Sequence, residues 1–112
     1  MELADGWMPF PNPAATAARR HTPELVTVDQ LAARLADAAE LERTAGRRLT
    51  DVMFSPVASA PFGSPEWDAG AFRAEMEAFA AIGVTTMAVH LPATDRATYC
   101  DLIAGFGRAV ID

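Results

Sequence analysis

Residues 84–91, VTTMAVHL, decide the fold, because eight consecutive β-branched or apolar residues with one histidine predict a largely buried strand. Gly83 ends the preceding helical pattern, and the PATD loop that follows supplies Thr94 or Asp95 as the cap of a last helix. The apolar face expected for this helix comprises Tyr99, Leu102, Ile103, Phe106 and Val110. The stretch therefore predicts a strand–loop–helix unit.

The same plan precedes this unit. In residues 51–58, DVMFSPVA, three contiguous apolar residues predict a strand buried on both faces. A helix is expected within residues 64–83, capped by Ser64 or Asp68 and ended by Gly83. Its apolar positions, spaced i, i+4 and i+7, are Phe72, Met76 and Phe79.

The first unit begins with a short apolar strand at residues 6–10, which is followed by a loop rich in proline and small residues. Thr27 and Gln30 have the spacing of a capping box, and Gly46 suits a left-handed helix end. The apolar stripe of this helix is Val28, Leu31, Leu35, Ala38, Ala39 and Leu41.

Three consecutive βα units predict parallel strands joined by crossover helices, in either a barrel sector or a doubly wound sheet. A nucleotide-binding doubly wound sheet needs a glycine-rich turn after its first strand, and neither G-x-G-x-x-G nor G-x-x-x-x-G-K-[ST] occurs. The nucleotide-binding form of the doubly wound sheet therefore loses its main support. We expect one domain over residues 1–112.

The composition limits which partners and which cellular location are expected. The 112 residues carry a net charge of −6, which argues against nucleic acid and anionic membranes as partners. Cys100 is the single cysteine, so no disulfide framework is possible and a cytoplasmic location is expected. No apolar run approaches the length of a membrane span.

Three segments carry a family resemblance: LADGWMPFPNP at residues 3–13, GRRLTDVMFSP at residues 46–56, and AAIGVTTMAVHLPATDRATYCDLIAGFGRAVI at residues 80–111. Together they resemble the C-terminal part of the luciferase-like monooxygenases, in particular the oxidoreductases that use the deazaflavin coenzyme F-420. The resemblance implies strands six to eight of a (β/α)8 TIM barrel.

The resemblance also implies an activity: hydride transfer or monooxygenation of a small organic substrate, with coenzyme F-420 or FMN bound in the complete enzyme. A full barrel needs about 250 residues, so we expect this fragment to bind neither cofactor by itself. The alternative is a non-catalytic barrel remnant that is inert or assembles with another chain. Open sheet edges predict self-association in either case.

His90 is the candidate catalytic residue. Strand alternation predicts Val84, Thr86, Ala88 and His90 on the inner face of the barrel, and Met87, Val89 and Leu91 toward the helices. His90 would then lie at the C-terminal end of its strand, where barrel active sites lie, and could polarise a substrate or donate a proton. A hydrogen-bonded histidine of the core or the rim is the alternative.

Two further residues are site candidates. Trp7 could stack on a planar cofactor, although aromatic residues near strand starts usually belong to a core, and Asn12 could contact the substrate from the loop that follows. Asp5 is expected to shape a turn. No metal site is expected, because His21, His90 and Cys100 lack ligand spacing, and Cys100 suits a small buried position on its helix.

Overall fold

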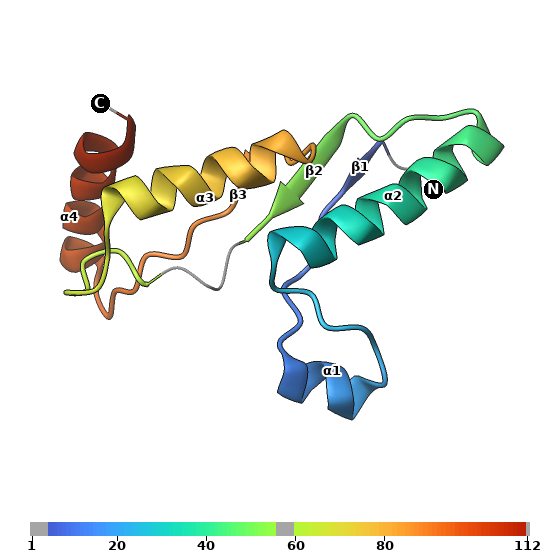
Figure 1. Cartoon of the computed structure of the whole chain (residues 1–112). Coiled ribbons are helices and arrows are strands. Elements are labelled where there is room, and N and C mark those ends of the chain that lie inside the picture. The colour runs from blue at the N-terminus through green and yellow to red at the C-terminus, as the bar shows by residue number, and fades with distance from the viewer. Residues whose placement is uncertain (1–4, 56–59, 112) are drawn as a thin grey trace.

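The computed structural model describes residues 5–55 and 60–111. Strands and helices alternate along the chain, and the three strands are parallel neighbours in the order β1-β2-β3 (Figure 1). The strands are β1 (Gly6–Trp7), β2 (Asp51–Phe54) and β3 (Thr86–Met87). The helices are α1 (Ala14–Arg20), α2 (Val28–Ala45), α3 (Ala69–Ala81) and α4 (Arg96–Phe106), and α4 continues into a π-helical turn, η1 (Gly107–Ile111). The predicted mixed α/β fold with parallel strands is confirmed.

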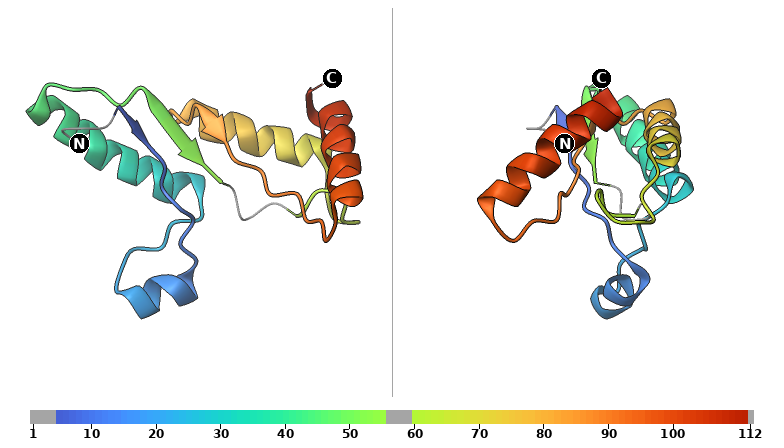
Figure 2. Two further views of the ribbon diagram at one scale, coloured as in Figure 1. Left: turned by 180° about the vertical axis from the view of Figure 1, so that it is seen from behind. Right: turned by 90° about the vertical axis from the view of Figure 1, so that its left-hand side faces the viewer.

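One face of the sheet is covered by helices. Val52 and Phe54 point to the same side of β2 and are buried with Leu31 of α2 and Phe79 of α3. The rings of Phe54 and Phe79 lie 5.1 Å apart. In the end-on view of Figure 2, α2 and α3 lie on the same side of β2. The core therefore lies between the sheet and this pair of helices.

The opposite face of the sheet is open in the part of the chain that is described. The ladder pairs Gly6 with Asp51 and Met53 with Thr86. Partners in a parallel ladder point to the same side, so these four residues share one face. Met53 is half-buried, and the other three are exposed. The expected burial of β2 on both faces is therefore wrong, since β2 is fully buried only where α2 and α3 cover it.

The helix ends follow the capping chemistry of the sequence. Thr27 and Gln30 form the complete capping box of α2, and Gly46 ends this helix with φ = 69°. Asp68 caps α3 and Asp95 caps α4, so these two, and not Ser64 or Thr94, provide the cap side chains. A second aromatic group joins α3 to α4, with Phe106 stacked edge-on against Phe62 and Phe72.

The strands are shorter than predicted. Residues 6–10 were expected to form one strand, yet regular pairing in β1 covers only two residues, and β3 likewise covers two of the eight expected. Both strands border a single partner, β2, among the described residues, so only one side of each can form a ladder. Residues 56–58 of the expected middle strand lie outside the described residues.

Helix α1 replaces part of the expected loop. The segment between β1 and α2 extends away from the sheet and returns to it (Figure 1). An antiparallel bridge between Asn12 and Leu25 closes it, with N–H···O distances of 2.8 and 3.0 Å. His21 ends the helix in the left-handed region at φ = 52°, which turns the chain back toward α2. Residues 12–25 thus form a closed excursion, which we call the α1 excursion.

Candidate functional site

The carboxyl ends of the strands are the first place to look for a site, because parallel sheets bind ligands at this edge. Residues 8–12 leave the end of β1, Ser55 leaves β2, and residues 88–91 leave β3. The Ser55 hydroxyl donates a 2.9 Å hydrogen bond to the carbonyl of Ala88, which ties the last two of these ends together. His90 follows two residues later.

His90 is exposed and lies outside regular structure. Thr86 lies on the open face, and Met87 packs against the core on the helix-covered face, as the predicted alternation requires. Val84 departs from it: the side chain is buried in the core with Phe79 instead of pointing to the inner face. The reason is that Val84 still belongs to the turn leaving α3, where its N–H donates to the carbonyl of Phe79 at 3.1 Å.

Trp7 and Asn12 are brought together at the other side of the sheet. Both line a surface depression of about 290 Å³ between the end of β1, the α1 excursion and α2, which we call the Trp7 depression. Trp7 is half-buried and packs against the core. Part of its indole ring therefore contributes to core packing, and the rest faces the depression. The structure does not bring His90 to this depression, because β2 separates β1 from β3.

Asn12 already uses its side-chain amide. Its Nδ2 donates to the hydroxyl of Thr22 at 2.9 Å and to the carbonyl of Pro23 at 2.6 Å. Together with the backbone bridge to Leu25, these bonds hold the α1 excursion against the end of β1. The nitrogen of Asn12 therefore positions the wall of the depression, and only its Oδ1 remains to accept a bond from a ligand.

Charged side chains on this depression were not singled out by the sequence analysis. Arg20 of α1, Arg34 of α2 and Glu24 of the α1 excursion all belong to its lining. Arg34 pairs with Asp37 at 3.2 Å, whereas no ion pair within residues 5–55 and 60–111 involves Arg20 or Glu24. The sequence feature that indicates Arg20 is the run AATAARR after Pro13, because it is a helix-forming stretch that ends in two arginines.

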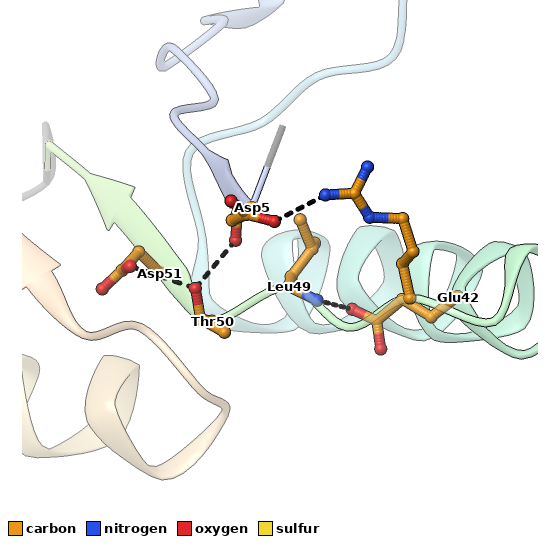
Figure 3. Close-up of polar contacts among 6 residues, drawn as sticks. Asp5, Glu42, Leu49, Thr50 and Asp51 are labelled. Carbon is orange, nitrogen blue, oxygen red and sulfur yellow. Dashed lines mark hydrogen bonds and ion pairs between the residues drawn. The ribbon is translucent and has the colours of Figure 1, made fainter. Parts of the chain in front are cut away.

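Asp5 lies at the amino-terminal ends of the strands, opposite the carboxyl ends, and has a structural role there. Its backbone carbonyl accepts hydrogen bonds from the N–H of Thr50 at 2.8 Å and from the hydroxyl of Thr50 at 3.0 Å (Figure 3). Its carboxylate pairs with Arg47 at 2.8 Å. The N–H of Leu49 in turn donates to Glu42 at 2.8 Å. These bonds join the starts of β1 and β2, so Asp5 anchors the sheet through Thr50 and Arg47. The expected role of Asp5 in a turn stays a prediction.

Two carboxylates have shifted acidities, and both lie away from the Trp7 depression. Burial raises the pKa of Glu75, which lines a separate depression beside Trp67. Hydrogen bonds from the backbone and hydroxyl of Thr98 lower the pKa of Asp95, the cap of α4. The first shift follows from desolvation and the second from helix capping, so neither requires a catalytic role.

The described residues contain neither a cluster of metal ligands nor a membrane-spanning helix. No group of three or more His, Cys, Asp or Glu residues there could hold a metal ion. Cys100 is exposed on α4, so the expected buried position is wrong, because α4 packs through Phe106 and leaves Cys100 in solvent. None of the described helices has the length and apolar character needed to cross a membrane.

Comparison with known proteins adds no neighbour. No family model matches the chain, and no curated protein and no solved structure matches it. The sequence resemblance and the geometry of the fold are therefore the grounds for a proposed function.

Proposed function

We propose that the chain forms strands six to eight, with their helices, of a (β/α)8 oxidoreductase of the luciferase-like kind. The reaction is hydride transfer or monooxygenation of a small organic substrate. The observation that carries this proposal is the sheet itself: three parallel strands in chain order, with α2 and α3 packed on one face.

The one-sided cover supports a barrel sector more than a doubly wound sheet. A doubly wound sheet has helices on both faces, whereas a barrel has helices outside and side chains filling the inside. Within the described residues the uncovered face carries Gly6, Asp51, Met53 and Thr86. In the proposal this face points to the barrel axis, and five further units complete the ring.

The described residues do not fit coenzyme F-420 or FMN as a complete cradle. Trp7 is half-buried and packs in part against the core, the amide nitrogen of Asn12 bonds Thr22 and Pro23, and His90 lies across the sheet from both. The sequence has no glycine-rich phosphate loop. In the proposal the other five units hold the cofactor, and His90 contributes a proton donor at the barrel mouth.

The first test is cofactor binding by the chain alone. Coenzyme F-420 and FMN are titrated separately into the purified chain, and cofactor fluorescence is followed. We expect no saturable signal up to micromolar concentrations. Saturable one-to-one binding would show that the chain itself carries the cofactor site and that the proposed division between units is wrong.

The second test restores the barrel. The chain is co-expressed with the first five βα units of an F-420-dependent luciferase-like enzyme, and reduction or oxidation of the coenzyme is measured. We expect complex formation and turnover, lowered by His90→Ala and unchanged by His21→Ala, a matched exposed histidine of the α1 excursion. Failure to assemble argues against the barrel sector, and equal activity of both variants argues against His90.

A further inference from the structure

The Trp7 depression has apolar walls and an exposed aromatic ring. Trp7, Phe10, Pro11, Pro23 and Leu25 supply its apolar surface. The Phe10 side chain is 72% exposed, although a phenylalanine ring is strongly favoured in apolar surroundings. A flat apolar ligand between Phe10 and the facing wall would remove both surfaces from water. The volume of about 290 Å³ is at the small end of ligand pockets and suits a ligand with one aromatic ring.

The charged side chains around the depression favour a ligand that carries a single negative charge. Two guanidinium groups and one carboxylate line it, which gives a local balance of +1 on a chain whose net charge is −6. Arg34 uses Nη1 to pair with Asp37, which does not line this depression, and keeps its other N–H donors. Arg20 keeps its whole planar fork, which matches the geometry of a carboxylate. Glu24 disfavours a ligand with further negative charge.

The walls are held in place before any ligand arrives. The Asn12–Leu25 bridge and the two side-chain bonds of Asn12 tie the excursion to the end of β1. Ala17 of α1 is buried, which fixes the helix that carries Arg20. A ligand therefore meets a preformed site, and the cost of ordering the walls has already been met in folding.

We propose that the depression formed by Trp7, Phe10 and the α1 excursion binds a small aromatic monocarboxylate. The ring lies against Trp7 and Phe10, and the carboxylate accepts hydrogen bonds from Arg20 and Arg34. This proposal depends only on the depression and is independent of the oxidoreductase hypothesis.

The test uses benzoate as the probe and benzamide, its uncharged analogue of the same shape, as the ligand control. Binding to the full chain is measured by calorimetry and by the indole N–H resonance of Trp7 in the labelled protein. We expect saturable benzoate binding with Kd near or below about 1 mM. Benzamide is expected to bind about tenfold or more weakly, because it lacks the charge-assisted bonds.

Arg20→Gln and Arg19→Gln form the matched pair of variants. They remove the same charge from neighbouring positions of α1, but only Arg20 lines the depression. We expect Arg20→Gln to weaken benzoate binding about tenfold or more and to leave benzamide unchanged. Arg19→Gln should leave both unchanged. Phe10→Ser should weaken both ligands, since it removes the ring contact.

Three results would overturn the proposal. The first is absence of saturable benzoate binding to the wild-type chain, which requires no variant. The second is equal affinity for benzoate and benzamide, and the third is an equal loss of benzoate binding in Arg19→Gln and Arg20→Gln, as diffuse charge attraction would give. Amide spectra of each variant check that its fold is unchanged.

Discussion

At the scale of single residues, Gly6 shows how the opening Asp-Gly-Trp segment is constrained by the sheet. A Cβ at this position would lie 3.2 Å from the carbonyl oxygen of Asp51 and 3.3 Å from its Cβ. Both residues are ladder partners on the open face, so the close approach follows from pairing. Gly6 is thus a strand residue whose missing side chain lets β1 approach β2.

We therefore expect Gly6→Ala to lower the free energy of unfolding by about 1 kcal/mol, because Asp51 must move to admit the methyl group. Gly105→Ala is the control. Its Cβ would meet the Phe62 ring at 3.5 Å, an ordinary contact, and alanine favours the interior of α4, so this change should stabilise by up to about 1 kcal/mol. Urea unfolding measures both. A stabilising Gly6→Ala would show that the pairing tolerates a side chain.

At the scale of elements, the caps were readable from the sequence because they depend on neighbours three residues apart. Thr27 with Gln30, and Asp68 with the N–H of Ala71, are local pairs that any chain with this spacing can form. The apolar faces were partly readable: Phe72 and Phe79 are buried as expected, whereas Leu41, Tyr99 and Ile103 are exposed. Their exposure depends on which elements pack beside them, and local spacing does not contain that information.

The candidate site was less readable than the helices. Asn12 was placed correctly in the loop after β1, but its bonds to Thr22 and Pro23 join residues ten and eleven positions away. Helix α1 depends on this closure, which is why residues 14–20 were expected to be loop. Arg20 and Arg34 come together only after the excursion folds back toward α2. Such long-range contacts escape an analysis based on periodicity.

The cap of α4 gives an element with a pH signature. Asp95 accepts hydrogen bonds from the N–H and hydroxyl of Thr98, and its pKa is lowered in the folded chain. A lowered folded pKa adds stability above the unfolded pKa, and this stability is lost as pH falls through the folded pKa. We expect the wild type to be more stable than Asp95→Asn at neutral pH, with a difference that begins to shrink as pH falls below about 4 and disappears below the lowered folded pKa.

Glu75→Gln is the control of opposite sign. Burial raises the pKa of Glu75, so its ionised form costs stability, and this cost appears as pH rises through the folded pKa. The free energy of unfolding of Glu75→Gln should therefore be higher than that of the wild type at neutral pH, and the two values should converge in acid. Denaturant unfolding at several pH values measures both differences. An Asp95→Asn difference that stays constant with pH would show that the charge of Asp95 does not stabilise α4.

At the scale of the whole molecule, the chain exposes more surface than a compact protein of its size. Its accessible surface is 7598 Å², whereas about 6,000 Å² is typical for a monomer of 112 residues. Its radius of gyration is 16.1 Å against about 13 Å for a compact domain. Figure 2 shows the reason: α4 lies at one end of an extended layer that contains the sheet, α2 and α3, and α1 projects away from this layer.

The extra surface coincides with unsatisfied edges. Among the described residues β1 and β3 each pair on one side only, and the open face between them lacks a helix. Unpaired strand edges can form a ladder with a strand of another chain. Association also removes exposed apolar surface from water, which is favourable. The same geometry that supports a barrel sector therefore also predicts that the chain does not remain alone in solution.

We expect sedimentation at micromolar concentration to give dimers or larger species, and Thr86→Lys to shift them toward monomer. Thr86 is an exposed residue of the edge strand β3, and a lysine there opposes edge pairing without touching the core. Tyr99→Lys is the control, because Tyr99 is 48% exposed on α4, away from the strands. If the sheet drives association, only the β3 variant dissociates.

A wild-type monomer that unfolds cooperatively would show instead that the three units are stable without a partner. Equal dissociation of both variants would show that association depends on general surface hydrophobicity and not on the sheet edge.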